Sequence, residues 1–334
     1  MKALESLIFA LKAVAPIIIM VVIGYMLKQL GFINERFIKE ANRLVFRIFM
    51  PVMLFVNIYK IEDLSSAIDL GFMGFAAIAL LIVFFLAIPT AIAVARQKNR
   101  RGVLIQATIR SGYSLIGFSV AESLCRDGGL MVATILSVII IPMFNVLTII
   151  SLVSIGNDGD EKPGLWKIIR DILTNPLIVG IAIGLACIGI RTIFGNVGIG
   201  FRLNQITPVM EVLEYLARLA IPLALLMLGA QFEFSAVASL KREIIWGVVL
   251  RTVIVPALVL GASYFVFGPD RFNQAQFATL VAAFATPVAV PSVPMVQEMG
   301  GDLTLAGQLV VWSTLASAVT MFLFIFLLRL GGAF

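Results

Sequence analysis

The stretch 283–301, AFATPVAVPSVPMVQEMGG, decides the fold of this chain. It is apolar and long enough to enter a bilayer, yet it carries Pro287, Pro291 and Pro294. Each proline removes a backbone N–H and its ring clashes with the carbonyl one turn earlier, so the segment is not one continuous α-helix. An unpaired backbone group costs several kcal/mol in hydrocarbon, so a broken helix is tolerated only where protein or a water-filled cavity surrounds it.

A break of this kind has two interpretations. Secondary transporters bind substrates at broken helices, because the freed backbone groups and half-helix ends become ligands. The alternative is a proline kink that only helps helices to pack. Three closely spaced prolines followed by Gly300 and Gly301 favour the functional break.

Composition places the chain in a membrane. Of its 334 residues, 60% are hydrophobic and 13% are charged, whereas a soluble domain has about 45–50% apolar and about 25% charged residues. The net charge of +6 does not indicate nucleic-acid binding, because the lysines and arginines lie between apolar runs, where they set topology. There is no histidine, and Cys125 and Cys187 stand alone, so we expect no metal and no cofactor. Without a nucleophile–base pair or a GxxxxGK[ST] motif, neither an enzyme nor an ATP-driven pump is indicated.

The sequence predicts an all-α membrane protein with about ten spans, each near the ~20 residues that a bilayer requires. The whole chain, 1–334, forms one transporter domain, with a first repeat at 1–155, a short cytoplasmic linker at 156–165 and a second repeat at 166–334. The expected spans are 7–30, 43–59, 71–95, 102–124, 130–155, 166–190, 207–232, 244–267, 275–299 and 303–330.

The distribution of basic residues predicts the orientation. The densest cluster, Arg96, Lys98, Arg100 and Arg101, lies between the third and fourth spans, so this loop is expected in the cytoplasm. Both termini are then outside the inner (plasma) membrane of the cell.

An internal repeat is visible in the same order in both halves. Segments 47–51 and 218–222 share the pattern Arg-x-x-x-Pro, and Pro89 and Pro256 follow at nearly the same offset. Two halves of five spans each enter the membrane from opposite sides. This is an inverted repeat, in which broken helices four and nine can cross at the midplane.

The fourth span, 102–124, is the expected partner of the proline-rich ninth. We expect it to break near Gly117 and to cross the ninth span near 287–291. Half-helix N-termini would then point at one spot and favour an anion. The alternative is that its glycines and serines serve close helix packing. The candidate substrate-binding residues are Arg110, Ser114, Gly117, Ser119, Asn145, Thr286, Pro287, Pro291 and Ser292, with Gly112 and Asn57 as further pocket residues.

Arg110 is the preferred counter-charge for an anionic substrate. It lies about 13 Å past Arg101 along a helix, too deep to reach water by snorkelling. A structural ion pair or bonds to carbonyls are the alternatives. Arg47 and Arg218 lie near span ends, where snorkelling explains them. For Arg251 the sequence leaves open a carbonyl or an acidic partner.

Four segments resemble the auxin efflux carrier family of prokaryotic and plant membrane transporters: NPLIVG at 175–180, IPLALLMLG at 221–229, ATP at 285–287 and QLVVWSTL at 308–315. The resemblance covers essentially the whole chain. It implies two inverted five-helix repeats, similar to bile-acid sodium symporters and sodium–proton antiporters, with crossing broken helices four and nine. It also implies a scaffold from spans one, two, six and seven, often dimeric, and transport of organic anions.

The fourth span departs from the family pattern Asn-x-x-x-x-Gly-x-Pro, because these positions hold Gly112, Gly117 and Ser119 here. The family's ligands in this span therefore have no direct counterpart.

The leading hypothesis is a secondary carrier of a small organic anion, a mono- or dicarboxylate, working as a homodimer by an elevator-type movement with the substrate at the crossing. One alternative is a membrane sensor or scaffold that has lost transport. Another is a symporter or antiporter coupled to H+ or Na+, which would require a carboxylate near the middle of a span, and the spans offer none.

Overall fold

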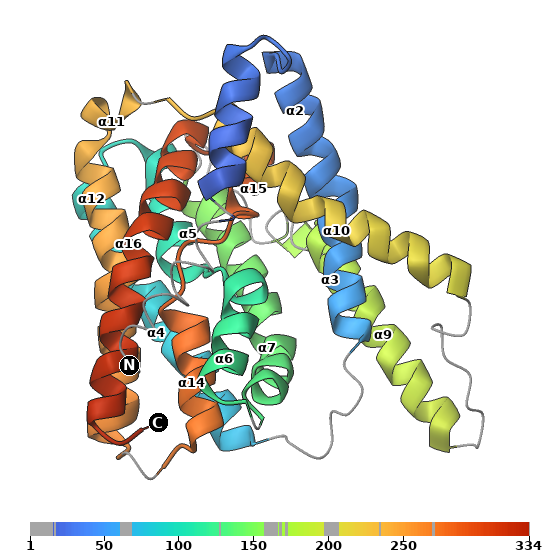
Figure 1. The fold of residues 1–334 in the computed structure, drawn as a ribbon, viewed down its shortest axis with the longest axis vertical. Coiled ribbons are helices and arrows are strands. Elements are labelled where there is room, and N and C mark those ends of the chain that lie inside the picture. Colours follow the sequence, from blue (N-terminus) through green and yellow to red (C-terminus); the bar gives the residue numbers. More distant parts are fainter. Residues whose placement is uncertain are drawn as a thin grey trace.

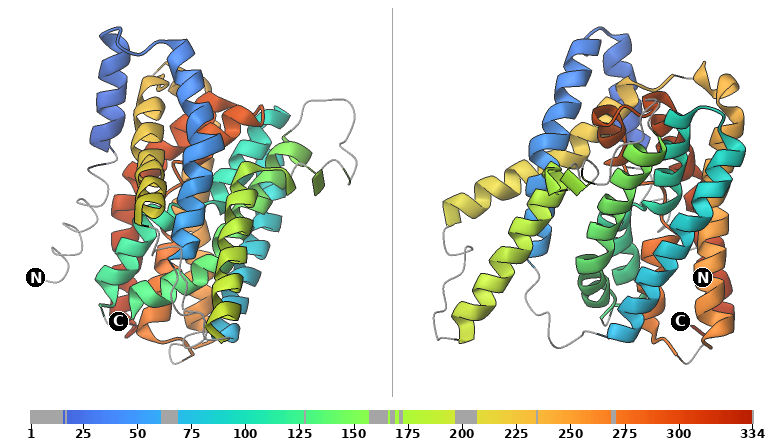
Figure 2. Two further views of the ribbon diagram at one scale, coloured as in Figure 1. Left: turned by 90° about the vertical axis from the view of Figure 1, so that its right-hand side faces the viewer. Right: turned by 180° about the vertical axis from the view of Figure 1, so that it is seen from behind.

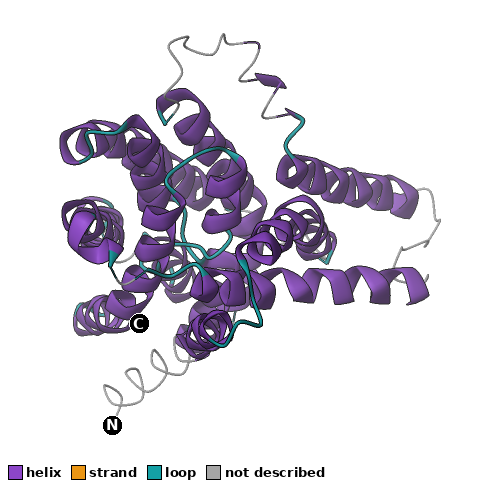
Figure 3. Ribbon diagram, turned by 90° about the horizontal axis from the view of Figure 1, so that it is seen from above, coloured by secondary structure: helices purple, strands orange, loops and turns teal. Residues whose placement is uncertain are grey.

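The computed structural model describes residues 16, 18–60, 69–126, 128–156, 166, 169–170, 173–196, 207–233, 235–268 and 271–333. These residues form helices joined by loops, and no strand occurs among them (Figures 1 and 3), which confirms the all-α class. Within the described part of the chain, seven helices are long and apolar enough to cross a membrane: Glu35–Tyr59, Leu70–Val94, Gly129–Ile155, Pro176–Phe194, Pro208–Ala230, Lys241–Val266 and Leu303–Leu330. Of the span expected at 7–30, residues 7–15 and 17 lie outside the described residues, and the apolar helix Ile18–Gln29 occupies most of the rest.

Two helices begin elsewhere than expected, because polar side chains cap them. α2 (Glu35–Leu44) begins well before residue 43, where the side chain of Asn34 accepts a hydrogen bond from the Phe37 amide. α9 (Pro176–Asn196) begins after residue 166, where the Asn175 side chain accepts from the Leu177 amide. A hydropathy pattern alone does not predict either capping residue.

Two long helices widen into π-turns just before a proline. η1 (Val45–Phe49) joins α2 to α3 (Met50–Tyr59), and η5 (Leu250–Ile254) joins α12 (Lys241–Val249) to α13 (Val255–Gly261). Because proline lacks the N–H of a regular turn, a local change of hydrogen-bond register is the expected response. The two π-turns carry Arg47 and Arg251.

The helices pack in two groups. The first, here called the α3 group, contains the helix Ile18–Gln29, α2, η1, α3, α9 and α10 (Thr207–Ala230). Within it the first helix and α10 approach backbone to backbone. A Cβ on Gly24 would lie 2.1 Å from the Leu226 carbonyl oxygen, and one on Gly229 would lie 1.9 Å from that of Val21. Glycine at both positions permits this contact.

The second group, here called the crossing group, occupies the other side of the molecule (Figures 1 and 2). The two groups meet mainly through α15, which contacts α2, η1 and α10, and through α7, which contacts α9. The crossing group contains α4 (Leu70–Val94), α5 (Lys98–Ile109), η2 (Tyr113–Gly117), α6 (Phe118–Leu124), α7 (Gly129–Ile150), η3 (Ser151–Ile155), α11 (Ala236–Ser239), α12, η5, α13, η6 (Ala262–Val266), α14 (Gln274–Phe284), α15 (Ser292–Glu298) and α16 (Leu303–Leu330).

Two segments of the crossing group are broken. α14 ends at Phe284 and α15 begins at Ser292, as the prolines predict. The other break was expected near Gly117, and that position is wrong: α5 ends at Ile109, and η2 begins at Tyr113. Gly117 lies inside η2 instead, where an added Cβ would lie 2.9 Å from the Ala282 carbonyl oxygen. Its role is close packing against α14.

Candidate anion site at the helix crossing

The two breaks are bound to each other through their backbones. The Gly112 amide donates to the Pro287 carbonyl at 2.8 Å, and the Ala289 amide donates to the Arg110 carbonyl at 3.2 Å. Ser111 and Val288 form an antiparallel bridge between these bonds. Each break therefore satisfies part of the other's exposed backbone, which a single broken helix in hydrocarbon could not do.

Arg251 satisfies most of the remaining carbonyl groups. Its side chain is fully buried, and its Nε donates to the Thr286 carbonyl at 2.9 Å. Nη1 donates to the Thr108 carbonyl at 3.0 Å, and Nη2 donates to those of Ala283 and Phe284 at 3.3 and 3.1 Å. Three of these carbonyls belong to the C-terminal ends of α5 and α14, where helix dipoles favour a cation, and that of Thr286 lies in the break after α14. Arg251 thus binds both breaks, and its partner is carbonyl oxygen rather than an acid.

Arg110 is a buried cation of a different kind. Its side chain is only 6% exposed, and Nη1 contacts the Met295 sulfur at 2.7 Å. Thioether sulfur is a weak acceptor. No carboxylate of the described residues forms an ion pair with Arg110. The guanidinium therefore carries a charge that its surroundings do not neutralise.

Further buried polar atoms without partners belong to the same segments as Arg110 and its Met295 contact. Gln106 of α5 precedes Arg110 by four residues, and both side chains reach α15. The Gln106 Nε2 donates to the Ser292 carbonyl at 3.5 Å, which leaves Gln106 Oε1 buried without a donor. The hydroxyls of Ser111 and Ser292 are also buried without a partner among the described residues. Together with Arg110, these unpaired neutral groups are the candidate ligands of an anion.

Four of the predicted site residues lie in or near the second break or are buried on a neighbouring helix. Pro287 lies in the break, and Pro291 caps α15. The Thr286 hydroxyl donates to Ala282 of its own segment, and the carbonyl of Thr286 accepts from Arg251. Asn145 is buried on α7, which contacts α5, and its Oδ1 has no donor in the described chain.

Three other predicted residues lie away from the buried groups. Ser114 is half-buried in η2, and Ser119 is exposed on α6, so Ser119 does not face an interior site. Asn57 lies on α3, whose contacts are chiefly with α9, α10 and η1. The sequence shows that a span contains a polar residue, but it does not show which face of the helix that residue occupies.

Sequence reasoning missed the polar contacts between the two helix groups. Arg47 was assigned to snorkelling, but its Nη2 lies 3.0 Å from a carboxylate oxygen of Glu298 on α15. Beside this ion pair, the Asn42 Nδ2 donates to the Gln297 Oε1 at 2.8 Å. The sequence signal was the acidic and amide pair at the end of the ninth span. Arg218 does lie exposed, and it pairs with Glu214 one turn away.

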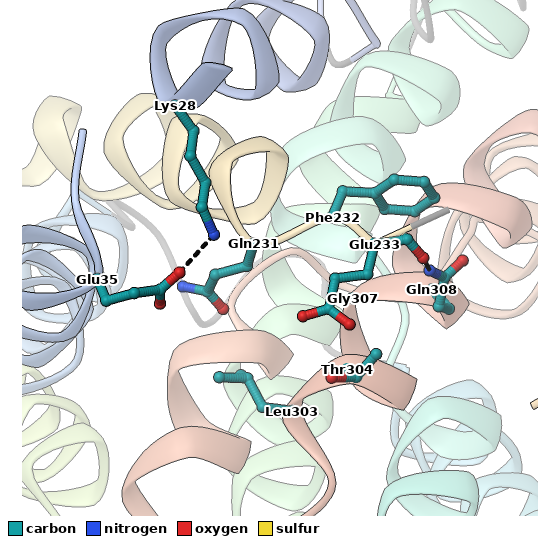
Figure 4. A pocket seen from close by; sticks show the side chains of 9 residues that line it. All are labelled: Lys28, Glu35, Gln231, Phe232, Glu233, Leu303, Thr304, Gly307 and Gln308. Carbon is teal, nitrogen blue, oxygen red and sulfur yellow. Dashed lines mark hydrogen bonds and ion pairs between the residues drawn. The ribbon is translucent and has the colours of Figure 1, made fainter. Parts of the chain in front are cut away.

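A separate polar cavity of about 100 Å³ lies between the end of α10 and the start of α16 (Figure 4). Lys28 and Glu35 form an ion pair on one side, and the Gln308 Nε2 donates to the Glu233 carbonyl on the other. Both polar atoms of Gln231 are buried there without a partner in the described chain. Two carboxylates around the cavity disfavour an anion, so the crossing is the better candidate for an anion site. Among the described residues no group of three or more Cys, Asp or Glu could hold a metal ion.

Comparisons with known proteins agree with this architecture. A family model described as membrane transport protein matches residues 9–325. An uncharacterized transporter from Methanothermobacter thermautotrophicus is 24% identical over 323 residues, covering 93% of this chain and 95% of that relative. An uncharacterized transporter from Methanocaldococcus jannaschii is 27% identical over 251 residues, covering 72% of this chain and 75% of that relative. The names of these relatives and of the family indicate a transporter rather than an enzyme. The chain therefore belongs to the membrane transport protein family, the auxin efflux carrier family that its sequence resembles.

Proposed function

We propose that this transporter is a secondary carrier of a small organic anion, a mono- or dicarboxylate, which binds at the crossing of the two broken helices. The observation that carries the proposal is Arg110. A buried cation costs about 2.5–3.5 kcal/mol on insertion scales and is kept only where something compensates it. Because the described residues offer Arg110 only a sulfur atom, a substrate carboxylate is the compensating group.

The neighbouring groups support a polar anion as the ligand. A carboxylate that replaces the Met295 sulfur would receive two parallel N–H bonds from the guanidinium, the geometry that arginine prefers. The unpaired hydroxyls of Ser111 and Ser292 can donate to the same anion.

Two inverted repeats of five helices, at 1–155 and 166–334, fit the order of the elements. A broken segment occupies 98–124 in the first half and 274–298 in the second, and each is followed by a long apolar helix. With the basic loop at 96–101 in the cytoplasm, both termini lie outside the plasma membrane. The α3 group would act as the fixed scaffold and the dimer-forming part.

An elevator-type movement would shift the crossing group along the α3 group. The contacts that such a movement must open are the polar bonds of α15, the ion pair Arg47–Glu298 and the hydrogen bond from Asn42 to Gln297. Arg47 is about half exposed, so this ion pair costs little to break. Its weakness suits a contact that is broken in each transport cycle.

The test is uptake of labelled mono- and dicarboxylates into proteoliposomes containing the purified protein. Arg110→Gln should weaken anion binding by about 10- to 100-fold, the equivalent of a hydrogen bond to a charged group. Arg110→Lys should also bind weakly, because an ammonium group cannot reproduce the fork of a guanidinium. The matched control is Arg218→Gln, which removes an exposed arginine that already has a carboxylate partner.

Unchanged anion affinity in both Arg110 variants would make that residue structural. If no anion is taken up at all, the carrier proposal fails and the sensor or scaffold alternative gains support. Repeating the uptake with imposed Na+ and pH gradients tests the cation-coupled alternative, in which either H+ or Na+ drives transport.

A further inference from the structure

An apolar groove runs along α4, between this helix and the segment formed by α13 and η6. It encloses about 530 Å³, and every residue that lines it is Leu, Ile, Val, Ala, Phe or Gly. On α4 the lining residues recur at helical spacing from Leu70 to Leu86, which is about 24 Å at 1.5 Å per residue. This is long enough for one acyl chain, which occupies half of a hydrocarbon core about 30 Å thick.

The volume of the groove is small compared with that of a second helix. A transmembrane helix with a diameter of about 10 Å would fill roughly 1,900 Å³ over this length, several times the enclosed space. Gly74 lines the groove, and no atom lies within 4 Å of the position that its Cβ would take. The groove is therefore open beside Gly74.

A cation stands at the Leu70 end of the groove. Arg271 Nη2 lies 2.8 Å from the position that a Cβ on Gly71 would take, and Gly71 lines the groove. The Arg271 guanidinium carbon lies 5.6 Å from the ring centroid of Phe272, and that ring in turn contacts Phe75 of the groove wall at 5.1 Å. The exposed guanidinium thus continues the groove into the polar region.

Asp69 is a carboxylate close to Arg271, and its oxygens are bound by other donors. One of its oxygens accepts from the Phe72 amide at 3.0 Å, and the other accepts from the Gln276 side chain at 2.9 Å. The bond from the Phe72 amide lowers the pKa of Asp69, so this carboxyl stays charged and holds Arg271 nearby. The described residues give Arg271 no ion pair, which leaves its N–H groups available to an anion.

We propose that this groove binds one phospholipid, with an acyl chain between α4 and the α13–η6 segment and its phosphate on Arg271. The guanidinium fork matches phosphate geometry, and phospholipids supply both parts of the ligand at this depth of the bilayer. The site is independent of the anion site at the crossing.

The experiment is native mass spectrometry of the delipidated full-length chain in detergent, titrated with palmitoyl-oleoyl phosphatidylglycerol and, separately, with oleic acid. Arg271→Gln should lower phospholipid affinity about tenfold or more by removing charge-assisted hydrogen bonds. Gly74→Leu should block the acyl chain without a clash, because the space beside Gly74 is open.

Two matched controls should bind the phospholipid as the parent does. Gly189→Leu adds the same side chain to an exposed helical glycine of α9 that also has open space beside it. Arg329→Gln removes another arginine from the last turn of α16, at the same end of the molecule (Figure 1). Undiminished phospholipid binding by either groove variant, equal losses in the controls, or oleic acid binding as tightly as the phospholipid would overturn the proposal.

Discussion

Two buried arginines lie at the crossing, and they differ in what surrounds their charge. Arg251 comes from the second half of the chain and donates to four backbone carbonyls of α5, α14 and the break that follows α14. Arg110 comes from the first break and contacts only the Met295 sulfur among the described residues. Both residues are arginines at the same crossing. They differ in whether unpaired backbone carbonyls lie within hydrogen-bonding distance of the guanidinium.

The difference shows that the two arginines have different functions at the helix breaks. Carbonyls at the ends of α5 and α14 have no partner within their own helices, and in hydrocarbon each would cost several kcal/mol. Arg251 donates to these carbonyls in the folded protein, and few of its N–H groups are left for a ligand. Most N–H groups of Arg110 have no acceptor among the described residues. Arg110 is therefore the arginine that can bind and release a ligand.

Removing Arg251 should therefore cause the largest loss of stability. Arg251→Leu leaves four carbonyls unpaired in a dry interior, and we expect the free energy of unfolding to fall by about 3–5 kcal/mol. Thermal or denaturant unfolding of the purified protein in detergent measures this. Arg218→Leu, which removes an exposed arginine, should change little and serves as the control. If the two variants unfold alike, Arg251 does not hold the crossing together.

Removing Arg110 should have a much smaller effect on stability. Arg110→Leu loses one contact to sulfur and also removes an uncompensated buried charge, so we expect a loss of no more than about 1 kcal/mol, or a gain. The same unfolding measurement applies. A destabilisation as large as that of Arg251→Leu would show that Arg110 has a structural partner. The two arginines would then not differ in function as inferred here from their contacts.

The sequence predicted the long helices well because hydropathy alone defines them. α4 was expected at 71–95 and spans Leu70–Val94, and α16 begins and ends as expected at Leu303 and Leu330. Prolines also located the break after α14. The substrate, the elevator movement and the dimer stay predictions.

The sequence could not locate features that depend on contacts between distant segments. The first break falls at 110–112 because its backbone pairs with 287–289, and neither segment alone encodes that pairing. The carbonyl partners of Arg251 and the ion pair of Arg47 with Glu298 arise in the same way. Gln106 was within reach of sequence reasoning, because it precedes Arg110 by four residues in the same expected span.

The last comparison extends from charges to the hydroxyls of two buried serines, Ser111 in the first break and Ser313 of α16 beside the second. The Ser313 Oγ accepts from the Val288 amide at 3.1 Å and donates to the Val310 carbonyl, whereas the Ser111 Oγ has no partner among the described residues. Ser313→Ala should cost about 1–3 kcal/mol of stability, because it leaves a buried amide unpaired.

Ser111→Ala should leave stability within about 0.5 kcal/mol of the parent, because an unpaired hydroxyl contributes no hydrogen bond to the fold. If this hydroxyl donates to the substrate anion beside Arg110, the same variant should weaken anion binding about three- to tenfold, the worth of one neutral hydrogen bond. Unfolding and binding measured on the same preparations separate these effects. A Ser111→Ala protein that is destabilised like Ser313→Ala would place Ser111 in the structural part of the crossing, and a variant that binds the anion as the parent does would remove it from the site.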